Sequence, residues 1–175
     1  MHLSHFTIIT KISTLSLNHS AKSISYSGSG LMNSELKALY RDTLLKHSRE
    51  PKNKRVLKDA DAYFELKNPL CGDLITLYLK VSQRIVSEAT FEAQCCSICM
   101  ASASMLTEQI TQSDIEGGID FAESLIESLL QPGISIATLE NEDIQSLAGV
   151  KSFPSRIRCA TLPWEAFKGA VSRLI

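Results

Sequence analysis

The sequence predicts an α+β domain in which a small antiparallel sheet of about three strands packs against a layer of helices. Residues 74–81 alternate apolar and polar side chains, as a strand with one covered face does. From residue 96 onward the apolar residues change to helical spacing. A chain of 175 residues, 44% of them hydrophobic, is also long enough to bury the core of one such domain.

The N-terminal stretch differs in composition from the rest of the chain. Residues 1–31 contain no Asp or Glu, are rich in Ser and Thr, and end in Ser-Gly-Ser-Gly-Leu. They lack the Arg of a transit peptide, and their apolar centre at residues 6–9 is too short for a secretory signal. We therefore expect residues 1–31 to be a disordered extension and residues 32–175 to form a single folded domain.

The first half of this domain is expected to contain one helix and the sheet. Ser34 can cap a helix over residues 34–48, and Pro51 ends it because the residue before a proline disfavours helical geometry. Residues 82–83 form a plausible tight connection between two strands. The strands are predicted at residues 62–66, 74–81 and 85–93.

Helices are expected to make up the second half. They are predicted at residues 96–112, 121–130, 143–147 and 161–175. Gly117 and Gly118 are expected to break the first of these, Pro132-Gly133 to close the second, and Gly149 to end the third. Pro163 is expected in the first turn of the last helix, where a missing N–H costs little.

Composition and charge exclude several classes of function. The net charge of −1 gives no basic field for nucleic acid or for an anionic membrane surface. No run of about 18 apolar residues predicts a transmembrane helix. Five cysteines are an odd number in a chain that can fold without disulfides, so we expect reduced thiols and a cytoplasmic protein.

Three separate segments carry cysteines in settings that suit a metal site. Cys71 lies between Pro69 and Gly72 on a predicted loop, and Asp73 follows two residues later, so a thiolate and a carboxylate can converge on one zinc ion. The alternative is a turn cysteine with an aspartate that caps its own backbone.

The other two segments provide thiols near positive charge. Cys96 opens a predicted helix, whose N-terminus favours a thiolate, and Cys159 follows Arg156 and Arg158, which would do the same. Each could instead be a small residue chosen for packing. Cys96 and Cys99 also form a C-x-x-C motif, but the expected antiparallel hairpin and helical block differ from the alternating β and α elements of thioredoxin-like proteins.

Four stretches of the chain resemble the U-type iron–sulfur cluster assembly proteins, the family of IscU and of the NifU N-terminal part. The stretches occur in the family's order and extend the resemblance over essentially all of residues 32–175. They are YRDTLLKHSREPKNKRVL at residues 40–57, NPLCGDLITLYL at 68–79, FEAQCCSICMASASMLT at 91–107 and FPSRIRCATLPW at 153–164. The resemblance implies a SufE/NifU-like α+β fold.

Within the family, the chain is most similar to the SufU branch of the SUF system. Arg158 stands where IscU-type scaffolds carry a His immediately before the last cysteine. The stretch between Cys96 and Cys159 also has room for an additional helix at residues 121–130. Cys95 and Cys99 depart from the pattern, because relatives usually have Gly and Ser there.

This resemblance implies a site, a cofactor and partners. The zinc ligands would be Cys71, Asp73, Cys96 and Cys159. Cys71 would accept persulfide sulfur from a SufS-like cysteine desulfurase and pass it to downstream cluster-assembly proteins, and Arg156 would pair with Asp73 when the ligands exchange. Whether such a sulfurtransferase-type partner is itself an enzyme stays open. The alternatives are a scaffold that assembles a 2Fe-2S cluster on the same cysteines, a structural zinc domain, or a thiol redox protein.

Overall fold

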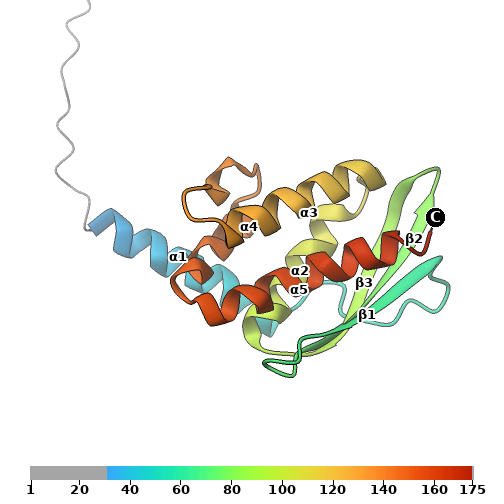
Figure 1. The fold of residues 1–175 in the computed structure, drawn as a ribbon, viewed down its shortest axis with the longest axis horizontal. Coiled ribbons are helices and arrows are strands. Elements are labelled where there is room, and N and C mark those ends of the chain that lie inside the picture. Colours follow the sequence, from blue (N-terminus) through green and yellow to red (C-terminus); the bar gives the residue numbers. More distant parts are fainter. Residues whose placement is uncertain (1–30, 175) are drawn as a thin grey trace, which may run out of the picture.

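The computed structural model describes residues 31–174 and has the α+β architecture that the sequence predicts (Figure 1). The predicted extension therefore lies outside the described residues, except for Leu31. No helix within residues 31–174 is long and apolar enough to cross a membrane. In chain order the elements are α1 (Leu31–Arg49), β1 (Ala62–Lys67), β2 (Leu74–Ser82), β3 (Ile85–Gln94), α2 (Ser97–Ile110), α3 (Ile115–Leu130), η1 (Ile136–Thr138), α4 (Glu142–Gln145), η2 (Ser146–Ser152) and α5 (Pro154–Val171).

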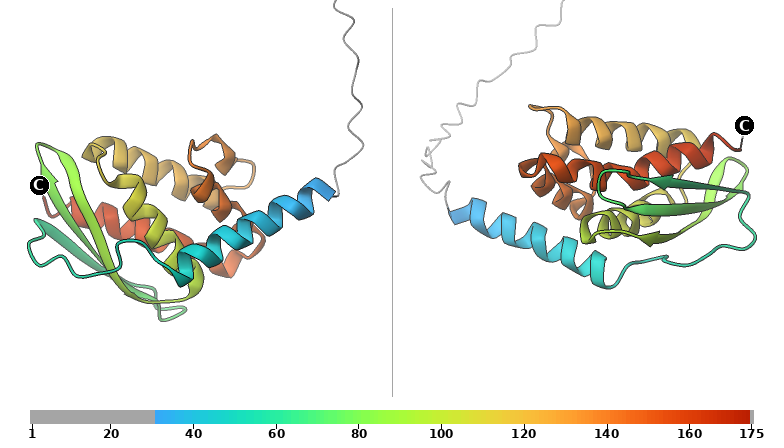
Figure 2. Two further views of the ribbon diagram at one scale, coloured as in Figure 1. Left: turned by 180° about the vertical axis from the view of Figure 1, so that it is seen from behind. Right: turned by 60° about the horizontal axis from the view of Figure 1, so that its bottom comes forward.

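The three strands form an antiparallel sheet in the order β1-β2-β3. Phe64, Leu77 and Phe91 are cross-strand neighbours on the face that packs against the helices. Figures 1 and 2 show α2 and α5 lying against this face, and α5 contacts both β1 and β2. The predicted tight turn lies one residue later, at Gln83 and Arg84, which both have positive φ as a type I′ hairpin requires.

The prediction that Gly117 and Gly118 break the helix predicted at residues 96–112, which is α2, was wrong. The chain turns earlier, and Asp114 caps α3 by accepting a hydrogen bond at Oδ1 from the Gly117 N–H (2.7 Å). Gly117 and Gly118 are therefore inside the first turns of α3. A Cβ on Gly118 would lie 3.0 Å from the Phe167 ring, so glycine at that position allows α3 to approach α5 closely.

The prediction for the last helix was also wrong, and the correction affects the cysteines. Pro154 occupies the start of α5, so Pro163 lies inside the helix rather than in its first turn. Cys159 is consequently a helical residue. Because proline has no N–H, the Cys159 carbonyl, four residues back, lacks its normal helical donor. The helical turn around Gly149 also continues, as η2, to Ser152.

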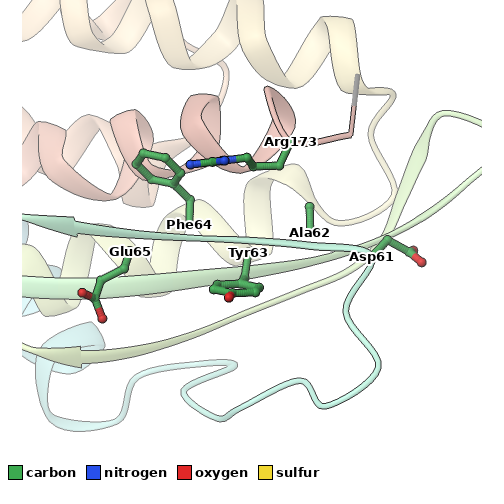
Figure 3. A pocket seen from close by; sticks show the side chains of 6 residues that line it. All are labelled: Asp61, Ala62, Tyr63, Phe64, Glu65 and Arg173. Atoms are coloured by element: carbon green, nitrogen blue, oxygen red, sulfur yellow. The ribbon is translucent and has the colours of Figure 1, made fainter.

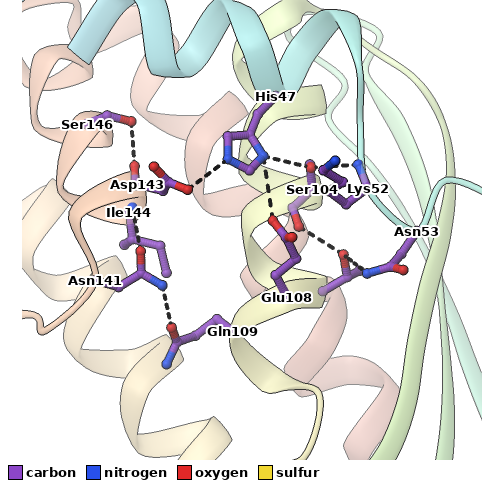
Figure 4. A network of polar contacts seen from close by, with 11 residues as sticks. His47, Lys52, Asn53, Ser104, Glu108, Gln109, Asn141, Asp143, Ile144 and Ser146 are labelled. Carbon is purple, nitrogen blue, oxygen red and sulfur yellow. Dashed lines mark hydrogen bonds and ion pairs between the residues drawn. The ribbon is translucent and has the colours of Figure 1, made fainter. Parts of the chain in front are cut away.

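A buried histidine connects α1 to two other helices (Figure 4). His47 on α1 is 5% exposed, and its Nδ1 lies 2.8 Å from Ser104 Oγ on α2. Its Nε2 lies 3.2 Å from Asp143 Oδ2 on α4. These contacts hold the C-terminal half of α1 beside α2, the helix that follows the predicted ligand Cys96.

Candidate metal centre

Three segments that are distant in sequence bring thiols and a carboxylate together. Cys71 and Asp73 lie on the turn between β1 and β2, Cys96 immediately precedes α2, and Cys159 lies in α5. One ligand atom from each of Cys71, Asp73 and Cys159 lies within 4.8 Å of the other two. The fold therefore gathers three of the four predicted ligands into a group that could hold one metal ion.

The turn before β2 is closed by backbone hydrogen bonds. Asn68 N–H donates to the Asp73 carbonyl (2.8 Å), and Gly72 N–H donates to the Asn68 carbonyl (2.9 Å). Gly72 has a φ of +76°, a conformation that residues with a Cβ rarely adopt. Pro69 fixes the entry to the turn. The turn thus places Cys71 at the surface and directs Asp73 inward, where it is 4% exposed.

Asp73 is a buried carboxylate whose two oxygens differ in their hydrogen bonding. Oδ1 accepts a hydrogen bond from the Cys96 backbone N–H (2.9 Å), whereas Oδ2 is buried and has no hydrogen-bond partner among the described residues. Burial raises the pKa of the Asp73 carboxyl, but interactions with the Cys71 thiol and the Cys96 N–H outweigh it and lower the pKa below its usual value. A buried, ionised carboxylate with an unsatisfied oxygen suits a cation.

The position of Cys159 also fits a metal site. Its side chain is completely buried, and its Sγ lies 3.7 Å from Cys71 Sγ. Two thiolates bound at about 2.3 Å to one tetrahedral zinc ion lie about 3.8 Å apart, so the spacing already suits zinc. Burial, followed by the interaction with the Asp73 carboxylate, raises the pKa of the Cys159 thiol.

Cys96 adjoins this group but lies outside the set within 4.8 Å. It is the N-cap residue of α2, with an extended backbone (φ −67°, ψ 164°). We expected the helix N-terminus to lower the pKa of its thiol, and this expectation was wrong. Burial raises the pKa of Cys96, and the charge of Asp73 adds to this, so the two outweigh the N–H groups of Cys99 and Ile98.

The two arginines before Cys159 also behave differently from the expectation. Arg158 pairs with Glu165 on the same helix, and the pKa of Cys159 is raised rather than lowered. Arg156 is exposed and makes no ion pair within the described part of the chain. Its pairing with Asp73 stays a prediction, because it requires a rearranged ligand set.

The two unexpected cysteines lie together beside the site. Cys99 is completely buried in the core, and Cys95 is half-buried. A hydrogen bond with Cys95, together with burial, raises the pKa of the Cys99 thiol. The nucleophile of a C-x-x-C redox motif is its first cysteine, here Cys96, and burial raises the pKa of that thiol too, so the electrostatics do not favour a redox pair between Cys96 and Cys99.

Sequence reasoning missed one residue of the site, Asn68. Its side chain is 2% exposed, and its Nδ2 donates a hydrogen bond to Cys71 Sγ (2.9 Å). The signal available in the sequence was the Asn-Pro pair, which is typical of turn initiation. That signal predicts the turn and says nothing of the contact with sulfur.

The candidate metal ligands lie outside the hollow beside β1. A hollow of about 440 Å³ lies along the first part of β1, where Arg173 extends beside the Phe64 ring (Figure 3). None of the predicted ligands lines it. The chemistry of the cysteines therefore does not depend on that hollow.

Comparisons with known proteins show which family the chain is similar to. The family model described as "NifU-like N terminal domain" matches residues 39–173. The chain is similar to the zinc-dependent sulfurtransferase SufU of Bacillus subtilis (strain 168), with 40% identity over 141 residues, 81% of this chain and 95% of that protein. It is also similar to the iron–sulfur cluster assembly scaffold protein IscU of Streptococcus pyogenes serotype M1, with 34% identity over 140 residues, 80% of this chain and 87% of that protein. A solved structure from Fervidobacterium islandicum AW-1, described as a cluster assembly scaffold for the SUF system, superposes with a TM-score of 0.63 at 26% identity, covering 82% of this chain and 99% of that one.

Proposed function

Because the chain belongs to the family of NifU-like N-terminal domains, we propose that it serves iron–sulfur cluster assembly as a zinc-bound sulfur acceptor. Cys71 takes persulfide sulfur from a SufS-like cysteine desulfurase, and the sulfur passes on to downstream cluster-assembly proteins. One observation carries the proposal: the ligand atoms of Cys71, Asp73 and Cys159 converge within 4.8 Å, and of the three residues Cys71 alone is exposed. The single domain of residues 32–175 carries this activity.

The four predicted ligands fit zinc in donor type and in the spacing of the two sulfurs. Cys71, Asp73, Cys96 and Cys159 would hold the ion. Zinc keeps thiols deprotonated and has no redox chemistry of its own, so it does not oxidise a thiolate that must later react. Asp73 contributes a carboxylate that is already ionised, the buried Cys159 contributes a thiol that substrates cannot reach easily, and Cys96 contributes a half-buried one.

Sulfur transfer requires only the chain's own exposed thiolate and the desulfurase persulfide. The Cys71 thiolate attacks the terminal sulfur, a new S–S bond forms to Cys71, and the S–S bond of the enzyme persulfide breaks. The desulfurase cysteine leaves as a thiolate and the proton stays on the transferred sulfur, so no oxidant is needed. Leu70, 89% exposed beside Cys71, supports docking of a partner at this point. Arg156 neutralises Asp73 when Cys71 moves away.

The state of the cysteines supports a cytoplasmic location for this activity. All five cysteines are free. Reduced thiols persist in the cytoplasm, where glutathione and thioredoxin oppose disulfide formation.

A desulfurase assay tests the proposal. We expect the zinc-bound protein to stimulate alanine formation from cysteine by a SufS-like desulfurase, and Cys71→Ser to abolish the stimulation. Cys95→Ser is the matched control, because it removes a neighbouring thiol outside the predicted ligand set and should retain the stimulation.

The similarity to an IscU scaffold favours a second candidate, assembly of a 2Fe-2S cluster on the same residues. Bound iron with labile sulfide and little stimulation would favour that candidate instead.

A further inference from the structure

We propose that Asn68 is a positioning residue for the Cys71 sulfur. Its side-chain amide holds Cys71 Sγ at the metal centre and keeps it oriented for attack once the sulfur leaves the metal. The second part of this inference rests on the proposed sulfur transfer. The first part concerns the ligand itself and can be tested without any transfer.

The hydrogen bonds around Asn68 determine which way its amide faces. The Leu70 N–H, which can only donate, lies 3.1 Å from Oδ1, so the atom at that position must be the acceptor oxygen. The other side-chain atom, 2.9 Å from Cys71 Sγ, is therefore the NH₂ group, and it presents a donor to the sulfur. A neutral thiol is a weak acceptor, whereas a thiolate is a good one, so this donor suits the reactive form of Cys71.

Burial makes Asn68 a fixed point next to an exposed ligand. Asn68 is 2% exposed, and its backbone N–H and carbonyl bond to Asp73 and Gly72. Cys71, three residues later, is exposed at the surface of the turn. Within the described residues, the Cys71 sulfur contacts Cys159, another predicted ligand, and the Asn68 amide. If the metal bond to Cys71 is lost, the amide therefore still holds the sulfur in place. A sulfur held in one position reacts faster with a docked persulfide than one that samples several rotamers.

Asn68→Ser separates the two tasks of the side chain. A serine hydroxyl can still accept the Leu70 N–H and keep the turn, but it provides no amide donor to Cys71. The backbone bonds of residue 68 are unaffected by the substitution. The matched control is Asn141→Ser, far from the site. The Asn141 side chain likewise accepts a backbone N–H, from Ile144 (3.1 Å), and donates its amide to a side chain, Gln109 Oε1 (2.7 Å).

Two measurements test the proposal. The first is the sulfur-to-metal charge-transfer absorption of the Co²⁺-substituted protein, because a hydrogen bond to a ligating thiolate stabilises its lone pairs. We expect the band to move to longer wavelength in Asn68→Ser and to stay unchanged in Asn141→Ser. The second is sulfur transfer from a SufS-like desulfurase to the zinc-bound protein. We expect kcat to fall about tenfold in Asn68→Ser, the factor for losing one hydrogen bond to a charged group, with KM for the desulfurase unchanged.

The outcomes separate this inference from the proposed function. An unshifted band with an unchanged kcat in Asn68→Ser overturns the positioning role, as does an equal shift in Asn141→Ser. If the unsubstituted protein accepts no sulfur, the proposed function fails, while the Co²⁺ spectra still decide whether Asn68 acts on the ligand. A loss of thermal stability shared by both variants, without a band shift, also overturns the proposal, because it shows a merely structural role.

Discussion

Zinc affinity should fall steeply as the pH is lowered, because the thiols of Cys96 and Cys159 must lose protons to bind the metal. The pKa values of Cys96 and Cys159 are both raised, so both thiols are protonated at neutral pH before zinc binds. The pKa of Asp73 is lowered, so its carboxylate is already ionised and releases no proton near neutral pH. At least two protons therefore leave when zinc binds, and protons compete with zinc at those two sulfurs.

The magnitude follows from the proton count. Two released protons weaken apparent zinc affinity about a hundredfold for each unit of pH lost between about pH 8 and pH 6.5, or about 2.7 kcal/mol per unit. Competition with a chromophoric chelator, corrected for the chelator's own titration, measures this slope. Cys95→Ser should leave the slope unchanged, whereas Cys159→Ser should lower it by about one proton. A slope below one proton would refute the reasoning, because it would mean that the thiolates exist before the metal arrives.

Three further substitutions test how the fold holds the site, each measured by urea unfolding. Ser102→Ala should cost about 2 kcal/mol, because it leaves the buried Trp164 indole N–H without its acceptor (2.9 Å) between α2 and α5; a cost near zero would contradict this. Lys151→Met should also cost about 2 kcal/mol, because its ammonium donates to three backbone carbonyls in the last turn of α3 and in the loop that follows; an unchanged midpoint would show that these bonds contribute nothing net. Gly169→Ala should destabilise by about 1–2 kcal/mol, since the new Cβ would lie 2.5 Å from the Phe64 ring; stabilisation would mean that the ring moves freely.

The bounds of the strands could be predicted closely from the sequence, because the alternation of apolar and polar residues that indicates a strand involves only neighbouring residues. The alternation over residues 74–81 and the two flanking strands appear in the structure within one or two residues of their predicted bounds. The helix ends were less predictable. Glycine and proline both disfavour helices in isolation. Gly117 and Gly118 nevertheless lie inside α3, where the lack of a Cβ on Gly118 allows close contact with Phe167. Pro163 lies inside α5 because that helix already begins at Pro154.

The candidate site could be predicted as a set of residues but not in its electrostatics. Three cysteine motifs in the family's order were enough to predict four ligands, and the fold brings ligand atoms of three of them, Cys71, Asp73 and Cys159, close together. The pKa directions of Cys96 and Cys159 could not be read from sequence, because burial outweighs the nearby helix end and the arginines. The contact between Asn68 and the Cys71 sulfur depends on how the turn closes, which residue spacing does not show.

The most direct test of the account is to locate the transferred sulfur. Zinc-bound protein would be incubated with a SufS-like desulfurase and cysteine, digested without reductant, and analysed by peptide mass spectrometry. The account predicts one additional sulfur atom on the peptide that contains Cys71, and none on the peptides of Cys95, Cys96, Cys99 and Cys159. Added sulfur on another cysteine, or none on Cys71 while the desulfurase turns over, would contradict the claim that Cys71 is the acceptor.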